Sequence, residues 1–495
     1  MNNQEKLQKL QNLKNAVEKS SKKASSEKFS ARQKLMSLFD EGSFIELFGF
    51  DTDENAGQGV VTGYGSVDGR LVYAYVHNSA VLGGAIGVRE TRKILSVLEL
   101  AEKTGAPVVS VVDSNGVKIE EGIDVLNSLG KMFSKTAALS GVIPQISVVI
   151  GACAGGSVFV PASSDFVFVV EKLSGMYLTG PAVTQGVTGV MTDSEALGGA
   201  KVCAQNGTAD FYFENESDCF AGVRGLIGLL PSNNLEFAVD APTDDINRIS
   251  ASLNGIVADE GAAYDVKSVI SEIADNNAVT EVGAMFAENM VTALIRLNGA
   301  TVGVVANQPA ADNGVIDIKA SKKAAAFISK CDSFNIPVVT FVDTDGFAIG
   351  AQFEADGISK YAAELLYAYA SATVPKVTVV LRKAYGSAYM AMCSKAVGAD
   401  VVFAYPTAEI AVMPAEGAAN LLYNDEIAAA KDPRAARTEK IQEFKDVIAA
   451  PYYAAAKGYV DDVIEPESTR PRIISVLEML AGKRVVNIAK KHGNI

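Results

Sequence analysis

The chain of 495 residues contains a long internal repeat. Residues 105–116 read GAPVVSVVDSNG, and residues 335–346 read NIPVVTFVDTDG. A second block comes later in the same order, GVIPQISVVI at 141–150 and ATVPKVTVVL at 372–381, so both blocks recur after about 230 residues. Two matching blocks in one order and at one spacing indicate two copies of one domain. A chain of this length is also too long for a single hydrophobic core.

Each copy alternates strand signals with helix signals. A proline opens a run of β-branched residues, which is typical of a strand buried on both faces of a sheet. A glycine-containing turn ends the run, and an amphipathic segment with helical periodicity comes next, as at 321–333 and 357–372. Strands that alternate with helices predict an α/β architecture.

The repeat also suggests where the domains lie. We expect a helical arm over residues 1–30, an N-terminal domain over 30–255 and a C-terminal domain over 270–495. The stretch 244–263 is polar and has little strand character, so we expect it to connect the two domains.

The charge of the chain argues against a nucleic-acid partner. The formal net charge is -14, whereas phosphate binding requires a concentrated positive surface. Residues 1–35 are an exception, with nine Lys or Arg against three Glu. This segment is either a solvated amphipathic arm or a basic cradle for an anion such as the phosphates of coenzyme A.

The few cysteines and histidines argue against a disulfide-bonded or metal-binding protein. The five cysteines stand singly, and the chain has only two histidines, His77 and His492. We therefore expect no disulfides, no metal site and a reducing, cytoplasmic compartment. The N-terminus does not have the pattern of a signal peptide. The most apolar stretch, 142–162, is interrupted by Pro144 and by Gly155-Gly156, so it predicts a strand, a turn and a helix instead of a membrane span.

The second repeated strand ends in small residues in both copies. Aligning the strands pairs Gly155 with Gly386, Gly156 with Ser387 and Ser157 with Ala388. Where a strand turns into a helix, small residues allow backbone N–H groups to face a ligand oxygen, and the first turn of a helix leaves such donors unpaired. Two donors aimed at one oxygen form an oxyanion hole. The alternative is that these residues only permit close packing, but their recurrence at equivalent positions favours the functional interpretation.

The sequence lacks the motifs of three common types of active or binding site: the Ser–His–Asp triad, the P-loop and the dinucleotide-binding glycine motif. Neither histidine lies near a nucleophile motif, which argues against a Ser–His–Asp hydrolase. The chain has no GxxxxGK[ST] loop, and its glycines do not have the GxGxxG pattern. The remaining chemistry needs oxyanion stabilisation and little side-chain acid or base.

At these residues the chain resembles the carboxyltransferase subunits of biotin-dependent acyl-CoA carboxylases, of the type of the propionyl-CoA carboxylase β subunit. The α subunit of sodium-pumping methylmalonyl-CoA decarboxylase is similar. The resemblance runs from about Phe29 to the C-terminus and rests on these stretches: GVVTG (59–63), GVIPQI (141–146), CAGG (153–156), LTGP (178–181), GGA (198–200), LPSNN (230–234), NQP (307–309), FNIP (334–337), ATVPK (372–376), RKAYG (382–386) and PTAEIA (406–411).

The resemblance implies two crotonase-like (ββα-spiral) domains per chain and a hexamer built as a trimer of dimers. The N-terminal domain would bind the acyl-CoA and the C-terminal domain the biotin. In such enzymes carboxybiotin breaks down to CO2 and a biotin anion, which takes the α-proton of the acyl-CoA, and the resulting enolate attacks CO2. No biotin-attachment dipeptide Met-Lys and no ATP-binding region is visible, so a biotin carboxylase and a biotin carrier, or the membrane subunits of a decarboxylase, would be the partners.

The resemblance also assigns the site residues. The amides of Gly155 and Gly156 would hold the thioester oxygen, with Ala154 in the substrate pocket. The amides of Ser387 and Ala388, supported by Gly386, would hold the ureido oxygen of biotin. Tyr389 and Met390 would border the acyl pocket.

The sequence departs from the family at four positions. Ser387 stands where relatives have a second glycine, and Asp345 where many have a proline. Asn115 replaces a usual glycine, and Met390 an acidic residue of many propionyl-type members, which leaves the acyl-chain length open.

Three functional hypotheses are consistent with these residues. They are a carboxyltransferase acting on a short acyl-CoA such as propionyl-CoA or acetyl-CoA, the same half-reaction run in reverse in a sodium-pumping decarboxylase, and a non-catalytic scaffold.

Residues beside the repeated strands have further interpretations. Arg382 and Lys383 are either surface residues or contacts for coenzyme A phosphates or a partner. Cys153 is expected to be a buried small residue. Asp113 and Asp343 end equivalent strands, where we expect them to cap turns.

Overall fold

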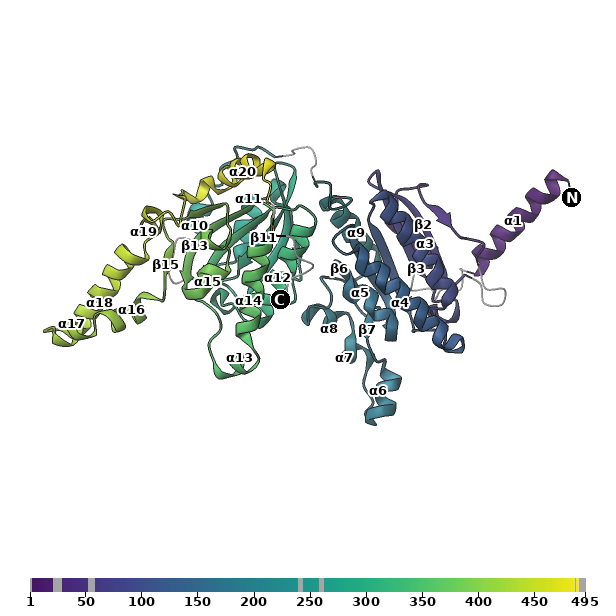
Figure 1. The fold of residues 1–495 in the computed structure, drawn as a ribbon, viewed down its shortest axis with the longest axis horizontal. Coiled ribbons are helices and arrows are strands. Elements are labelled where there is room, and N and C mark those ends of the chain that lie inside the picture. Colours follow the sequence, from purple (N-terminus) through teal and green to yellow (C-terminus); the bar gives the residue numbers. More distant parts are fainter. Residues whose placement is uncertain are drawn as a thin grey trace. The chain divides into compact units, whose positions relative to one another are not determined.

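The computed structural model describes residues 2–20, 29–51, 58–238, 244–257, 262–485 and 487–488. It forms two compact units, Met1–Phe237 and Ala238–Ile495. Each unit contains one eight-stranded sheet covered by helices (Figure 1). The prediction of two α/β copies from the sequence repeat is therefore confirmed.

The first unit has a mixed sheet whose central strands are parallel. Its spatial order is β1 (Ile45–Leu47), β2 (Val60–Val67), β3 (Arg70–His77), β4 (Val108–Ser114), β5 (Gln145–Ala154), β6 (Phe166–Val170) and β8 (Phe211–Phe213), with β7 (Gly175–Tyr177) paired to the end of β5. Strands β1, β2 and β3 are antiparallel neighbours, and the pairs from β3 onward are parallel.

The second unit repeats this topology strand for strand. Its order is β9 (Val279–Val282), β10 (Met290–Leu297), β11 (Ala300–Asn307), β12 (Val338–Thr344), β13 (Lys376–Tyr385), β14 (Val401–Ala404) and β16 (Asp462–Val463), with β15 (Glu409–Ala411) paired to the end of β13. The repeated blocks of the sequence thus form the parallel pairs β4–β5 and β12–β13. Antiparallel strands followed by parallel β–α units, present once in each unit, are expected for a duplicated crotonase-like domain.

Helices of the first unit differ in length and role. They are α1 (Asn3–Ser20), α2 (Ala31–Leu38), α3 (Val88–Thr104), α4 (Gly122–Leu139), α5 (Phe159–Ser163), α6 (Pro181–Thr188), α7 (Ser194–Gly198), α8 (Ala200–Gln205) and α9 (Glu216–Leu229). Helices α3 and α4 pack side by side, and their buried residues Ile94 and Leu129 share a core with Tyr73 and Val108 of the sheet. The α3–α4 layer therefore covers one face of the first sheet.

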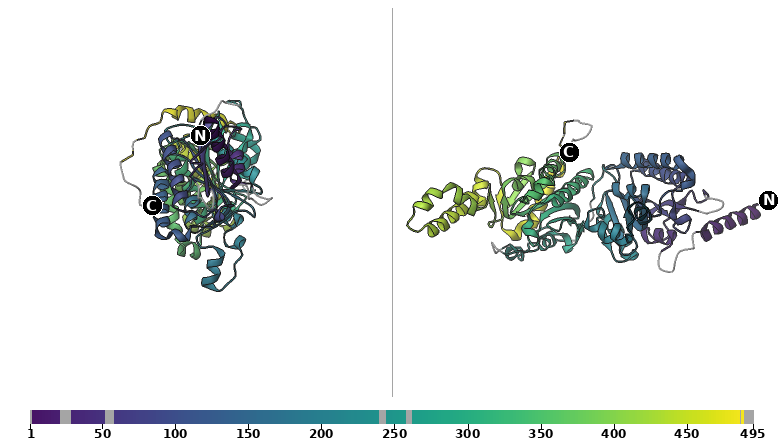
Figure 2. Two further views of the ribbon diagram at one scale, coloured as in Figure 1. Left: turned by 90° about the vertical axis from the view of Figure 1, so that its right-hand side faces the viewer. Right: turned by 90° about the horizontal axis from the view of Figure 1, so that it is seen from below.

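The second unit has a matching layer and an added arm. Its helices are α10 (Leu253–Ile256), α11 (Val266–Ile273), α12 (Ile318–Ser333), α13 (Ala351–Ala355), α14 (Ile358–Ser371), α15 (Gly386–Ala391), α16 (Ala415–Leu422), α17 (Asn424–Ala429), α18 (Pro433–Glu443), the π-helix η7 (Phe444–Ala449), α19 (Pro451–Ala456) and α20 (Thr469–Met479). Helices α12 and α14 pack together as α3 and α4 do, and α11 and α20 contribute to the core on the sheet. Helices α16, α17 and α18 project away from this sheet in Figures 1 and 2.

The polar stretch between the repeats packs with the second unit. From the sequence we expected residues 244–255 to lie at the end of the first domain and in the connection. In the structure the fully buried Arg470 lies 2.6 Å from Asp275 and 3.7 Å from Asp244, and Arg248 also pairs with Asp244 at 2.8 Å. The two guanidinium groups hold the pKa of Asp244 down at about 2. A charge cluster of this kind has no hydrophobic periodicity, so its docking leaves little signal in the sequence.

His77 is a buried residue whose protonation state affects folding. It ends β3 and has neither ring nitrogen hydrogen-bonded within the described part of the chain. Burial lowers its pKa to about 4, with Asp113 opposing and Lys34 adding to the effect. Because the unfolded chain binds this proton below about pH 6.5, the neutral native state is favoured above that pH and loses stability as pH falls toward 4.

This predicts a specific pH dependence. The second unit has Asn307 at the equivalent end of β11, where its side chain donates to the Gly314 carbonyl at 3.2 Å. The free energy of unfolding of the wild-type chain should fall between pH 7.5 and pH 5, and about 2 kcal/mol of that fall should come from His77. In His77→Asn this part of the fall should be absent. Denaturant unfolding of both proteins at the two pH values measures this. An unchanged pH dependence in the variant would show that His77 does not titrate on unfolding.

Candidate active site

In both sheets the strand pairing shifts register near the ends of β5 and β13. In the first unit Val112 pairs with Val149, whereas Ser114 pairs with Cys153. The register shifts equivalently in the second unit, between Val342 and Thr344 of β12. The extra residues of β5 and β13 form a bulge, and a bulge bends a strand and redirects the residues after it. Each bulge thus sets the direction in which its strand enters the turn at Gly155 or Gly386.

A buried aspartate faces each bulge. In the second unit one carboxylate oxygen of Asp343 accepts hydrogen bonds from Arg382 Nε at 3.0 Å and from the Tyr264 hydroxyl at 2.9 Å. The other accepts from the backbone N–H of Lys383 at 3.2 Å. Burial raises the pKa of this carboxyl, and Arg382 opposes the rise.

The first unit uses different partners for the same position. Lys34 of α2 lies 3.5 Å from the carboxylate of Asp113. This carboxylate packs against the backbone of Gly151, where an added Cβ would lie 1.9 Å from Asp113 Oδ1, and where φ is +153°. Only glycine fits this bulge, because any side chain would collide with the carboxylate.

Two expectations about these residues are corrected. The aspartates do not cap the turns after their strands; the hydroxyls of Ser114 and Thr344 accept from the N–H groups of Gly116 and Gly346 instead, at 3.2 and 3.1 Å. Arg382 is not a surface residue, because it is buried against Asp343.

The neighbouring Lys383 is also paired, although it is partly exposed. Its ammonium group lies 2.8 Å from Asp345. Sequence patterns missed Tyr264 and both pairings because the partners are distant in the chain and only the fold brings them together.

The first corner comes directly after the bulge. Strand β5 ends at Ala154, Gly155 adopts a left-handed φ of +64°, and a short 3-10 turn (Gly155–Val158) leads into α5. The Ser157 hydroxyl donates to the Ala154 carbonyl at 2.7 Å and fixes this turn. A Cβ added to Gly155 would meet no atom within 4 Å, so the space beside it is open. The first N–H groups of the turn have no acceptor within it and can face a ligand there.

The second corner has the same backbone form. Tyr385 ends β13, Gly386 adopts a φ of +59°, and α15 begins immediately. A Cβ on Gly386 would approach the Val412 carbonyl at 3.3 Å. Ser387 is exposed and Ala388 is buried. The two corners are equivalent in strand, bulge, left-handed glycine and helix start.

The other predicted site residues lie around these turns. Ala154 is half-buried and immediately precedes Gly155. Tyr389 and Met390 lie in α15, where Tyr389 is half-buried and Met390 is exposed. Each residue lies within four positions of its own corner.

Cys153 is a structural residue, as expected from the sequence. It has no exposed surface, and burial raises the pKa of its thiol to about 12. All five cysteines of the chain are buried free thiols.

We expect the native protein to be unreactive toward iodoacetamide at pH 8 and to retain activity, whereas the unfolded chain should take up five equivalents of the reagent. Mass spectrometry measures the labelling of both states. Rapid native labelling of Cys153 with loss of activity would contradict its structural role.

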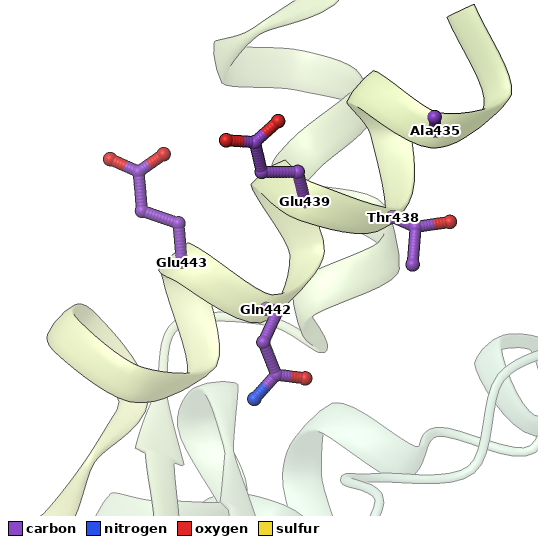
Figure 3. A pocket seen from close by; sticks show the side chains of 5 residues that line it. All are labelled: Ala435, Thr438, Glu439, Gln442 and Glu443. Atoms are coloured by element: carbon purple, nitrogen blue, oxygen red, sulfur yellow. The ribbon is translucent and has the colours of Figure 1, made fainter.

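A separate hollow lies beside α18 of the second unit. It is lined along α18 by Ala435, Thr438, Glu439, Gln442 and Glu443, and the carboxylates of Glu439 and Glu443 lie one turn apart on the same side (Figure 3). None of these residues belongs to the corner elements, so we assign no chemistry to this hollow.

Metal sites and membrane spans are both absent from the described residues. Among them no group of three His, Cys, Asp or Glu is arranged to hold a metal ion. None of the helices in the described ranges has the length and apolar character needed to cross a membrane.

The fold defines a duplicated crotonase-like α/β protein. The model of the carboxyl transferase domain family matches residues 22–495. The chain belongs to this family and is a carboxyltransferase enzyme.

Named relatives show which members it is similar to. The methylmalonyl-CoA decarboxylase subunit alpha of Veillonella parvula is 48% identical over 481 residues, which cover 94% of this chain and 93% of the relative. The propionyl-CoA carboxylase beta chain of Saccharopolyspora erythraea is 45% identical over 493 residues, covering 94% and 90%. The crystal structure of the hexameric transcarboxylase 12S with methylmalonyl-coenzyme A bound matches with a TM-score of 0.96 and 44% identity, covering 100% of this chain and 98% of that one.

Proposed function

We propose that this chain transfers a carboxyl group between biotin, held on a separate carrier protein, and the α-carbon of a short acyl-CoA. The observation that carries the proposal is the pair of equivalent corners, each with a left-handed glycine at the start of a helical turn whose first amides have no acceptor within the turn. Propionyl-CoA and methylmalonyl-CoA are the favoured pair, because relatives at 45–48% identity bear their names.

The first corner would act on the acyl-CoA. The amides of Gly155 and Gly156 would donate to the thioester oxygen, which gains negative charge as the α-carbon becomes an enolate. Such donors stabilise the transition state more than the substrate, because the charge is larger there, and one donor is worth about 3–4 kcal/mol. Cys153 and Ser157 are buried beneath this turn and would keep it rigid.

The second corner suits a neutral ureido oxygen. Its donors are backbone amides of Ser387 and Ala388 beside Gly386, and uncharged donors of this kind fit a carbonyl-type oxygen that becomes anionic. Biotin, when bound, supplies the carboxyl-carrying nitrogen and the base. The protein's own part is to orient the ureido oxygen and to hold its charge. Tyr389 and Met390 would border the acyl group, and the exposed Met390 would affect which chain length is accepted.

Assembly and direction are part of the proposal and rest on the relatives. We expect a hexamer, as for transcarboxylase 12S. We place the enzyme in the cytoplasm, with a biotin carboxylase and a carrier as partners for carboxylation, or with membrane decarboxylase subunits for the reverse direction. The half-reaction at the corners is the same in both cases.

The test uses the purified chain with methylmalonyl-CoA and free biotin. We expect propionyl-CoA to form only when biotin is present, and malonyl-CoA to serve as the comparison substrate. Liquid chromatography of the acyl-CoA products measures both. No biotin-dependent turnover with any short acyl-CoA would exclude the proposed reaction and leave the non-catalytic scaffold.

A further inference from the structure

The residue before the second corner makes a contact that the first corner lacks. The Tyr385 hydroxyl donates to a carboxylate oxygen of Glu409 on β15. Strand β15 pairs with β13 in register, Lys383 opposite Glu409 and Tyr385 opposite Ala411, so the carboxylate lies beside the last residues of β13. Tyr385 is also the residue that precedes α15, whose first amides form the corner. The contact with Glu409 therefore holds the residue from which the corner begins.

Glu409 is held from the other side by a helical segment of the second unit, residues 415–449. From here on we call this segment, and not residues 1–30, the helical arm. The second carboxylate oxygen of Glu409 lies 3.0 Å from the ammonium group of Lys445. Both side chains are mostly buried, with 15% of the Glu409 side chain and 22% of the Lys445 side chain exposed. An ion pair at this depth is less screened than a surface pair and has a defined geometry.

Lys445 lies in an unusual helical segment. The π-helix Phe444–Ala449 continues directly from α18, and such segments are rare and often occur at functional positions. The buried Phe444 and Ala449 pack on Ala415 and Ala418 of α16. The π-helix thus turns Lys445 toward β15 while its flanking residues anchor the arm.

The first unit has no counterpart of this arrangement among its described residues. The strand pairing places Ala154 where the second unit has Tyr385, and Gly175 where it has Glu409. Neither can form the hydroxyl–carboxylate contact. The difference matters because the two corners are otherwise equivalent in backbone form, so it distinguishes the biotin corner from the acyl-CoA corner.

We propose that Tyr385, Glu409 and Lys445 form a positioning relay through which the docking of the helical arm sets the geometry of the second corner, and hence the binding and orientation of biotin. This inference rests on the proposed function. The three residues act through the backbone of α15 and are not catalytic. Removing any one of them should misplace the amides of Ser387 and Ala388 without affecting the first corner.

The experiment compares Tyr385→Phe and Lys445→Met with the wild-type chain in carboxyl transfer from methylmalonyl-CoA to free biotin. Each variant should lower kcat/KM for biotin by about 10- to 100-fold, since small displacements of catalytic donors have effects of this size. The KM for methylmalonyl-CoA should rise by no more than about twofold, because the amides of Gly155 and Gly156 lie in the other unit and only Tyr389 and Met390 of α15 would border the acyl group. Lys440→Met is the matched control: Lys440 is an arm lysine paired with Glu443 at 2.9 Å and Glu426 at 3.2 Å, and neither glutamate belongs to the relay.

A double variant makes the test specific for a relay. If Lys445 acts through the Tyr385 hydroxyl, Lys445→Met should have little further effect in the Tyr385→Phe background. Fully additive losses, or a biotin kcat/KM that Tyr385→Phe leaves unchanged, would overturn the relay. An equal rise in the KM for methylmalonyl-CoA would also overturn it, because that would indicate general damage. A wild-type chain without biotin-dependent transfer would instead overturn the proposed function, and the relay to biotin with it.

Discussion

Gly156→Pro should lower kcat for carboxyl transfer by about 10²- to 10³-fold while leaving the fold and the assembly state unchanged. The substitution removes one backbone N–H from the first corner and no side-chain interaction. Proline is tolerated in the first turn of a helical segment, because the N–H there has no acceptor within the helix. The loss should appear mainly in kcat, because the donor acts on charge that develops in the transition state. Steady-state kinetics with methylmalonyl-CoA and biotin measure it.

Gly156→Ala is the matched control for this change. It keeps the N–H and adds a Cβ that would lie 3.3 Å from Cδ1 of Leu129, the end of a flexible side chain. We expect this variant to retain most of the activity. Normal turnover in Gly156→Pro, with light scattering showing an unchanged assembly, would remove the first corner from the mechanism. Equal losses in both variants would show that space at Gly156 matters more than its amide.

Asp343→Ala should destabilise the second unit by about 3–5 kcal/mol, the usual cost of removing one partner from a buried ion pair. The change takes the carboxylate from the buried Arg382 and the acceptor from Tyr264 and from the Lys383 N–H. For a unit of this size the thermal midpoint should fall by about 10 °C. Calorimetry, which can resolve the two units, is the measurement.

Two further variants test whether burial of the Asp343–Arg382 pair is the reason for the large loss of stability in Asp343→Ala. Asp345→Ala breaks the nearby pair with Lys383, in which the aspartate and lysine side chains are 34% and 27% exposed, and should cost at most about 1 kcal/mol. Combining Asp343→Ala with Arg382→Met should be less destabilising than Asp343→Ala alone, because the buried charge is removed as well. A loss below about 1 kcal/mol in Asp343→Ala would contradict an essential role for the pair.

Local sequence patterns predicted much of the fold because they act over short distances. Proline-led β-branched runs predicted β4, β5, β12 and β13, since such residues favour buried strands. Helical periodicity at 321–333 and 357–372 predicted α12 and α14. The glycine turns at 155 and 386 were found by the same alignment. The polar segment 244–257 was predicted less well, because its docking depends on Arg470, which lies 225 residues from Asp245 along the chain.

The sequence by itself determined the duplication, the two corners and the family. Each of these can be recognised from short contiguous stretches of residues. Only the tertiary structure decided what supports the corners. The bulges that face Asp113 and Asp343, the choice of Lys34 or Arg382 as the cation, and the contacts from Tyr385 through Glu409 to Lys445 all join distant segments. The physical reason is that a buried charge selects its partner by proximity in the folded sheet, and sequence spacing carries no record of that proximity.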